Sequence, residues 1–218
     1  LQNARVALFG LGGVGGYTLE ALARSGVGQL DLIDNDTVSL SNLNRQILAT
    51  YDTVGMRKVD AAKQRVLSIN PECIVRTYAV FYTPETAGQF DFTQYDYIVD
   101  AIDLVSCKLD LAETALKLNI PLIAALGTGN KLDATLLQVT DISKTYGCPL
   151  ARVMRKELRT RGIHHLKVVF SPEKPVSPAQ PEAPPPGRRS VPASNPWVPA
   201  TAGLLLGSAV VRDLIAQV

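Results

Sequence analysis

The feature that most restricts the fold of this chain is a glycine-rich loop between an apolar segment and a helical pattern. Residues 6–9 are apolar and lead into the loop, whose glycines are Gly10, Gly12, Gly13 and Gly15. Residues 14–25 then carry apolar side chains at helical spacing, and residues 30–33 form a second apolar run that ends at Asp34. A strand, a tight turn, a helix and a strand within about thirty residues predict a βαβ unit.

The alternation of strands and helices continues along the chain. The pattern predicts helices over 54–69 and 106–118 and strands over 74–78, 97–100 and 121–126. This order is typical of an α/β fold with a doubly wound, mainly parallel, Rossmann-like sheet. After residue 133 the pattern changes to a strand over 135–139, a basic helix over 149–161 and a strand over 166–170, which predicts a mixed C-terminal part.

In this setting the glycine loop favours nucleotide binding. Gly10 permits the tight turn, and Gly12 and Gly13 let backbone N–H groups approach a phosphate. Gly15 lets the helix pack closely on the strand. Asp34 follows Gly15 by nineteen residues and stands where an acid accepts hydrogen bonds from ribose hydroxyls. A glycine turn of purely structural use is the alternative, and the loop alone does not specify the nucleotide.

Two cationic residues that follow Asp34 distinguish this sequence from those that bind a nicotinamide dinucleotide. The two phosphates of a nicotinamide dinucleotide are satisfied by a helix N-terminus, whereas ATP carries more charge to neutralise. Arg45 and Lys58 would hold the β- and γ-phosphates and stabilise a departing pyrophosphate, which makes them catalytic candidates. Solvated surface charges are the alternative. The polar block before Lys58 supplies further candidates for contacts with ATP: Asp36, Asn42, Asn44 and Gln46.

The strand over 97–100 is associated with two acids. Asp100 ends it and Asp103 follows, at the carboxyl edge of a parallel sheet, where ligands bind. A carboxylate at this edge suits Mg²⁺ shared with phosphate oxygens. Position favours Asp103 as the metal ligand and third catalytic candidate, while Asp100 is closer to the strand and could hydrogen-bond locally.

We expect a single domain over residues 1–218, because a chain of this length can bury a core without disulfides. Residues 1–133 would form the nucleotide-binding core and residues 134–171 the strand, basic helix and strand. Residues 172–199 hold ten of the fourteen prolines, so we expect an extended surface crossing there. Residues 200–218 would form an apolar helix that packs on the core.

Cysteine usage and hydropathy favour a cytoplasmic location. The three cysteines, Cys73, Cys107 and Cys148, lie far apart and match neither zinc nor redox spacing. The sequence opens without a signal-peptide pattern and holds no continuous run of the roughly 18–20 apolar residues of a spanning helix, so we expect no stable membrane insertion. Gly203 and Gly207 are spaced like a membrane helix pair, but Arg212 and Asp213 interrupt that segment.

The block from Asp34 to Gln46, taken with the glycine loop, resembles the adenylyltransferase superfamily that includes the ubiquitin-activating enzymes and the activators of sulfur carriers. The resemblance implies a homodimer and attack of a carboxylate on the α-phosphorus of ATP. Carrier-activating members commonly hold zinc with two CxxC pairs, which this sequence lacks, so we expect ATP and Mg²⁺ but no zinc. The resemblance implies that Gly13 contacts the nucleotide, Asp34 the ribose and Asp103 the magnesium. It implies contacts with the phosphates for Asn42, Arg45 and Lys58.

Segments 127–133, 139–145, 148–157 and 167–171 are similar to one branch of that superfamily, the tRNA threonylcarbamoyladenosine dehydratases. This resemblance implies a tRNA substrate whose threonyl carboxylate is adenylated and then captured within the substrate, which closes a ring and releases AMP and pyrophosphate. Activation of the C-terminus of a ubiquitin-like sulfur carrier is the alternative, and a nucleotide-binding regulatory module is a third hypothesis. A sulfur-transfer protein is also considered as a partner, and Cys148 is the candidate thiol, although an incidental thiol is the simpler interpretation.

The basic helix independently supports a nucleic-acid partner. Spacings of three and four place Arg152, Arg155, Lys156 and Arg159 on one face of the helix over 149–161. Such a stripe suits the phosphates of nucleic acid, so these four residues are the tRNA-binding candidates. A solvated helix face is the alternative.

Overall fold

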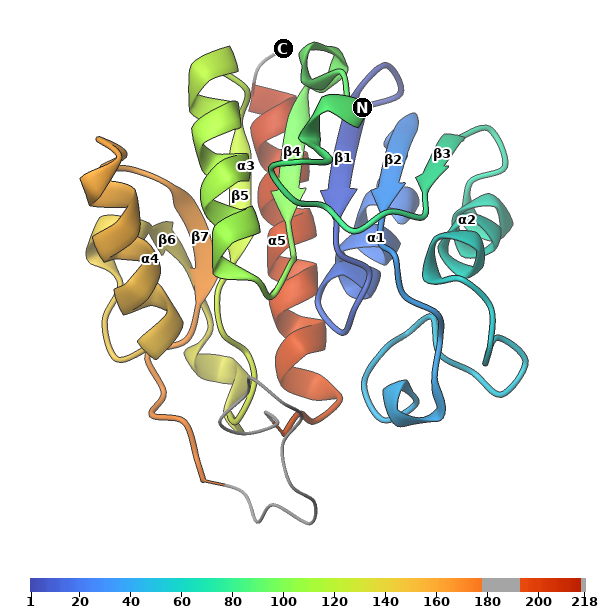
Figure 1. Cartoon of the computed structure of the whole chain (residues 1–218). Coiled ribbons are helices and arrows are strands. Elements are labelled where there is room, and N and C mark those ends of the chain that lie inside the picture. The colour runs from blue at the N-terminus through green and yellow to red at the C-terminus, as the bar shows by residue number, and fades with distance from the viewer. Residues whose placement is uncertain (178–192, 217–218) are drawn as a thin grey trace.

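The computed structural model describes residues 1–177 and 193–216, and these contain a seven-stranded sheet (Figure 1). The strand order is β3-β2-β1-β4-β5-β7-β6. Neighbouring strands are parallel except β6 and β7, which are antiparallel. The strands are β1 (Arg5–Phe9), β2 (Gln29–Ile33), β3 (Ile74–Tyr78), β4 (Tyr97–Asp100), β5 (Leu122–Ala125), β6 (Gln138–Asp141) and β7 (Lys167–Phe170).

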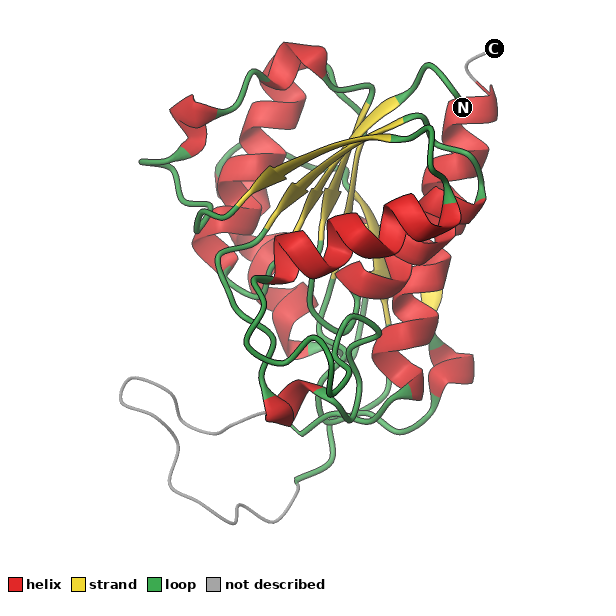
Figure 2. Ribbon diagram, turned by 90° about the vertical axis from the view of Figure 1, so that its right-hand side faces the viewer, coloured by secondary structure: helices red, strands yellow, loops and turns green. Residues whose placement is uncertain are grey.

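Helices cover both faces of the sheet (Figure 2). Successive residues of β1 point to opposite faces, so Val6 and Leu8 join the core under α1, α2 and α5, while Ala7 and Phe9 join the core under α3 and α4. The α-helices are α1 (Gly15–Arg24), α2 (Lys58–Ile69), α3 (Val105–Leu118), α4 (Pro149–Thr160) and α5 (Trp197–Ala216). Single 3₁₀ turns are η1 (Leu40–Asn42), η2 (Ala87–Gln89), η3 (Phe92–Gln94), η4 (Ala134–Leu136) and η5 (Ile142–Lys144).

The packing of α5 on α1 depends on two glycines. A Cβ on Gly203 would lie 2.8 Å from the Cβ of Tyr17, and one on Gly207 would lie 2.5 Å from the Cβ of Ala21. Thr18 Oγ1 donates a hydrogen bond to the carbonyl of Gly203 at 3.1 Å. By length and composition α5 could cross a membrane, with a mean hydropathy of 1.4, but half of that stretch is buried inside the fold. The two glycines thus serve the contact between these helices.

The predicted α/β class and the mainly parallel, doubly wound sheet with a mixed end are confirmed. Two predicted elements are wrong at their boundaries. The helix over 54–69 begins only at Lys58, because Gly55 has a φ of +88°, which a helix does not accommodate. The strand over 135–139 is replaced by η4 and then β6, because the Asp133 carboxylate accepts a hydrogen bond from the N–H of Thr135 at 2.8 Å and forms a turn.

The C-terminal helix begins at Trp197 rather than at residue 200. Oδ1 of Asn195 accepts a hydrogen bond from the N–H of Val198 at 2.9 Å, and Pro199 suits the first turn of a helix. The predicted surface crossing therefore ends before Trp197, and its residues 178–192 lie outside the described part of the chain.

The strand order shows where on the sheet a ligand would be expected to bind. Connections leave the neighbouring strands β1 and β4 toward opposite sides, so the crevice at their carboxyl ends is a topological switch point, where ligands bind in open α/β sheets. The parallel strands end at the lower edge of the sheet in Figure 1. The glycine loop and the segment with Asp103 both start from this edge.

Candidate functional site

The glycine loop after β1 turns tightly against the loop after β4. Gly10 has a φ of +91°, and a Cβ there would lie 2.6 Å from the carbonyl oxygen of Ala101. A Cβ on Gly15 would collide with the carbonyl oxygen of Gly10. Within the described chain, α1 starts at Gly15 without a side-chain cap or an acid in its first turn. Its first N–H groups and the positive end of its dipole therefore favour an anion beside Gly12 and Gly13.

Asp34 holds this loop in place. One carboxylate oxygen accepts a hydrogen bond from the N–H of Leu11 at 2.7 Å, and the other accepts from the N–H of Asp36 at 2.8 Å. A carboxylate oxygen can accept a second hydrogen bond, so the ribose contact stays a prediction. The structure adds a role in loop geometry that the sequence pattern alone does not indicate.

Arg45 lies on the segment between β2 and α2, and Lys58 is the first residue of α2. The stem of Arg45 packs beside the loop, with its Cγ 3.5 Å from the position of a Cβ on Gly13. Its Nη1 donates to the carbonyl of Ser41 at 2.9 Å and to Oδ1 of Asn44 at 2.8 Å. The Nζ of Lys58 lies 2.8 Å from the Asp36 carboxylate. The structure thus brings Arg45 to the glycine loop and gives Lys58 an acidic partner.

Asn42 and Asn44 are engaged in local structure. Asn42 is buried, and its Oδ1 accepts a hydrogen bond from the N–H of Ser39 at 3.1 Å, which completes a capping box around η1. Nδ2 of Asn44 donates to the carbonyl of Ser194 at 3.1 Å. The serine three residues before Asn42 is the signal in the sequence that indicates this cap. A phosphate contact by either amide stays a prediction.

Gln46 is buried beside Gly12, and one polar atom of its side chain has no hydrogen-bond partner among the described residues. Its Nε2 lies 4.0 Å from the position of a Cβ on Gly12, and its Oε1 has no hydrogen-bond partner among residues 1–177 and 193–216. A buried polar atom without a partner costs about 1–3 kcal/mol, so its presence points to a missing donor such as a ligand hydroxyl or a water. The side chain therefore fits a nucleotide site.

Asp100, which ends β4, and Asp103, which follows it, have different environments. Asp100 is fully buried, and its Oδ1 lies 3.0 Å from Nζ of Lys108 and accepts a hydrogen bond from the N–H of Ile102 at 3.1 Å. Burial raises the pKa of Asp100, and the charge of Lys108 opposes that rise. Asp103 is exposed at the carboxyl edge. The exposed acid is therefore the one available to a metal ion, and Lys108 is a residue that sequence reasoning missed.

The four basic candidates on α4 share one face and line a cavity of about 360 Å³ together with Thr160. Arg152, Lys156 and Arg159 are exposed. Nη1 of Arg155 donates to the carbonyl and to Oγ1 of Thr145, both at 2.6 Å. The structure therefore leaves three cations of this face open to solvent and ties the fourth to η5. The helix α4 that carries these residues lies away from the loop between β1 and α1 (Figure 1).

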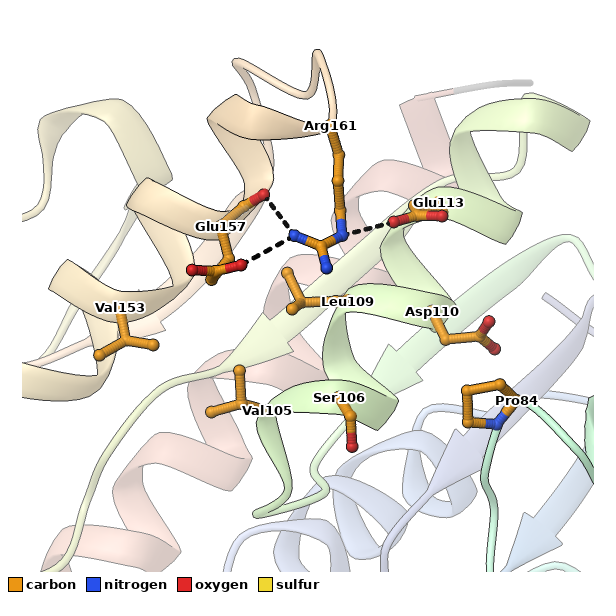
Figure 3. A pocket seen from close by; sticks show the side chains of 9 residues that line it. All are labelled: Pro84, Val105, Ser106, Leu109, Asp110, Glu113, Val153, Glu157 and Arg161. Atoms are coloured by element: carbon orange, nitrogen blue, oxygen red, sulfur yellow. Dashed lines mark hydrogen bonds and ion pairs between the residues drawn. The ribbon is translucent and has the colours of Figure 1, made fainter.

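A second cavity of about 490 Å³ lies between α3 and α4 (Figure 3). Arg161 bridges the two helices across it, 2.7 Å from Glu113 and 3.0 Å from Glu157. None of the described residues that line either cavity belongs to the glycine loop. We therefore assign the nucleotide site from the loop geometry and not from these cavities.

Cys148 is poorly placed for transfer chemistry. Its side chain is buried, and the residue directly precedes α4. Burial raises the pKa of the thiols of Cys73 and Cys107. A nucleophilic thiol needs access to its substrate, so the geometry favours the interpretation that Cys148 is an incidental thiol.

Comparisons with known proteins agree with this arrangement. The sequence model of the ThiF family matches residues 1–213. The tRNA threonylcarbamoyladenosine dehydratase of Bacillus subtilis is 44% identical to this chain, over 100% of the chain and 89% of the relative.

Solved structures resemble the whole fold. The Escherichia coli tRNA N6-threonylcarbamoyladenosine dehydratase in complex with ATP has a TM-score of 0.87 and 36% identity, over 99% of this chain and 87% of that one. The complex of the same enzyme with AMP has a TM-score of 0.88, at the same identity and coverage. The fold described above is thus similar to one that binds an adenine nucleotide.

Proposed function

The chain belongs to the ThiF family and, within it, to the tRNA threonylcarbamoyladenosine dehydratases, and from this membership we propose that it uses ATP to cyclise threonylcarbamoyladenosine in tRNA. The observation that carries the proposal is the similarity over the full chain to an enzyme of this name. The gathering of the glycine loop, Arg45 and Asp103 around one switch point supports it.

ATP would bind with its phosphates at the N-terminus of α1. The N–H groups around Gly13 and the cations Arg45 and Lys58 supply the positive field that a triphosphate needs. The Oε1 of Gln46, which has no hydrogen-bond partner in the described part of the chain, fits a buried contact with the bound nucleotide or its water. Asp103 would hold Mg²⁺, which when bound neutralises charge on the phosphates.

In the proposed reaction an oxygen of the threonyl carboxylate attacks the α-phosphorus of ATP. The bond from that phosphorus to the bridging oxygen breaks, and pyrophosphate leaves with the charge that Arg45 and Lys58 stabilise. A nucleophilic group of the same substrate then attacks the acyl-adenylate carbonyl and releases its proton, and AMP leaves with the carboxylate oxygen. The substrate loses one water overall. The second step needs no enzyme thiol, which agrees with the burial of Cys148.

The basic face of α4 would contact the tRNA backbone. Arg152, Lys156 and Arg159 are exposed on one face, and the described residues that line their cavity include no acid. An array of this kind recognises phosphates independently of sequence and does not contact the reacting base.

We also propose a homodimer, as the resemblance implies, and a location in the cytoplasm, as cysteine usage and hydropathy favour, with a sulfur-transfer protein considered as a further partner. The segment between β2 and α2 exposes the apolar side chains of Leu40 (63%) and Tyr51 (82%), which a second copy could cover. Light scattering of the purified protein measures the oligomeric state.

The function is tested by incubating the protein with ATP, Mg²⁺ and tRNA that carries threonylcarbamoyladenosine. The expected product is a nucleoside lighter by one water, formed together with AMP and pyrophosphate. No mass loss with freshly purified protein would reject the proposal. Adenylation of the C-terminus of a ubiquitin-like sulfur carrier, without tRNA, would support the alternative substrate instead.

A further inference from the structure

Asp100 and Lys108 form an ion pair in the interior, directly behind the loop that carries Asp103. Their side chains are 0% and 1% exposed. A buried ion pair stabilises a fold poorly, because lost hydration offsets the attraction, and well-packed apolar residues often serve as well. Lys108 also lies near the start of α3, where the helix dipole disfavours a cation. Stability alone does not explain the pair.

The two side chains join β4, β5 and the turn after β4. Oδ1 of Asp100 accepts a hydrogen bond from the N–H of Ile102, and this bond closes the turn that precedes Asp103. Nζ of Lys108 also donates to the carbonyl of Ala125, the last residue of β5, at 2.7 Å. The pair therefore fixes the carboxyl ends of two neighbouring strands.

The residue enclosed by this turn contacts the glycine loop. Ala101 donates its N–H to the carbonyl of Phe9 at 2.8 Å, and its own carbonyl faces Gly10 so closely that no side chain fits there. Any shift of the turn would thus be transmitted to the loop after β1. Asp103 is exposed, and its carboxylate forms no hydrogen bond or ion pair with the described residues, so its backbone determines its direction.

We propose that Asp100 is a positioning residue: by accepting the hydrogen bond from the N–H of Ile102 it fixes the backbone carrying Asp103 and thereby sets the rate of adenylation. The inference rests on the proposed function, which gives Asp103 its role. Contacts with the nucleotide come mainly from the glycine loop, Arg45 and Lys58. Removal of the acceptor that Asp100 supplies to the turn therefore lowers kcat for AMP formation much more than it raises KM for ATP.

The experiment compares two double variants that both lack buried charge. D100N/K108M keeps an acceptor for the N–H of Ile102, whereas D100L/K108M fills a similar volume and removes that acceptor. Folding is checked by thermal melting, and ATP binding by calorimetry. D100N/K108M should keep kcat within about threefold of the wild-type value, and D100L/K108M should lose more than about tenfold, with KM for ATP changed by less than about threefold in both.

Equal kcat values for the two double variants overturn the inference, whether both are active or both are impaired. If D100L/K108M does not fold, D100V/K108M, which has a β-branched residue suited to the end of a strand, supplies the same comparison. The wild-type protein separates the two hypotheses. Its failure to form AMP with the modified tRNA rejects the proposed function, whereas an active wild type with equally active double variants rejects only the positioning role.

Discussion

The ammonium group of Lys58 lies 2.8 Å from a carboxylate oxygen of Asp36, although the lysine side chain is 6% exposed and the acid is 60% exposed. A hydrogen bond from the N–H of Lys58 to the carbonyl of Asp36, at 2.9 Å, joins the same residues. Lys58 begins α2, so the two bonds hold its charge near the carboxyl end of β2. The exposed acid can exchange this partner for water when a phosphate takes the lysine.

Removal of the Lys58 charge should therefore matter more than removal of its acidic partner. Lys58→Met keeps the stem and loses a charge-assisted bond to phosphate, so kcat/KM for ATP should fall by about 10- to 100-fold. Asp36→Asn should change it by less than about threefold, because partly exposed ion pairs contribute little. The rate of pyrophosphate release at a series of ATP concentrations measures kcat/KM for both variants. Equal losses would show that the ion pair, rather than the lysine, is what the reaction requires.

Arg45 and Asp103 should be required for chemistry but not for folding. Arg45→Ala and Asp103→Ala should each reduce AMP formation by about 100-fold or more, since each removes charge stabilisation around the phosphates. Arg57→Ala is the matched control, because Arg57 is exposed and pairs with Asp60 at 2.6 Å. Melting curves of all three variants should stay close to that of the wild type. Wild-type turnover in either test variant contradicts the phosphate and metal assignments.

Local sequence chemistry predicted the core of the fold but not its irregular segments. The apolar runs before Gly10 and Asp34 are short, end at turn-forming residues and are buried in the structure. Their strands can therefore be predicted from hydropathy alone. The helix over 54–69 was predicted from apolar spacing that continues through Gly55, whose left-handed φ only the structure reveals. The turn at Asp133 also depends on neighbouring residues alone. Its sequence signal is an acid two residues before the N–H that donates the hydrogen bond, and this signal is common in sequences that do not form a turn.

Some residues of the candidate site could likewise be predicted from the sequence, whereas others could not. Residue type and spacing suffice to select Arg45, Lys58 and Asp103. Contacts between distant segments are not visible in the pattern. The Oε1 of Gln46 is buried without a hydrogen-bond partner among the described residues, and Lys108 reaches Asp100 and β5 only once the sheet has formed. Side-chain environments that depend on the tertiary fold could therefore not be predicted from the sequence.

The exposed cations of α4 should control tRNA affinity without affecting ATP. Replacement of Arg152, Lys156 and Arg159 by alanine should weaken tRNA binding and reduce the slope of log affinity against log salt by roughly one for each phosphate that is no longer neutralised. Arg161→Ala is the control, because Arg161 is paired with Glu113 and Glu157. Fluorescence anisotropy over a salt series measures the slope. An unchanged slope in the triple variant indicates a solvated helix face.

Asp213 should contribute a pH-dependent part of the stability. Partial burial works to raise the pKa of Asp213, but hydrogen bonds from Lys167 at 2.6 Å and from Tyr97 at 2.6 Å outweigh it and hold the pKa below its ordinary value. A carboxyl group whose pKa is lower in the folded state stabilises the protein above its unfolded pKa, near 3.9, and loses that effect as pH falls through the folded pKa.

The difference in melting temperature between the wild type and Asp213→Asn should therefore be constant from about pH 5 to 7 and should shrink as the pH falls below about 4. Asp52→Asn, which removes an exposed acid, controls for the change in net charge and should leave melting almost unchanged. Calorimetric melting over this pH range measures both variants. A difference that stays the same down to about pH 2 would show that Asp213 acts through packing and neutral hydrogen bonds, because protonation would then cost the folded state no more than the unfolded one.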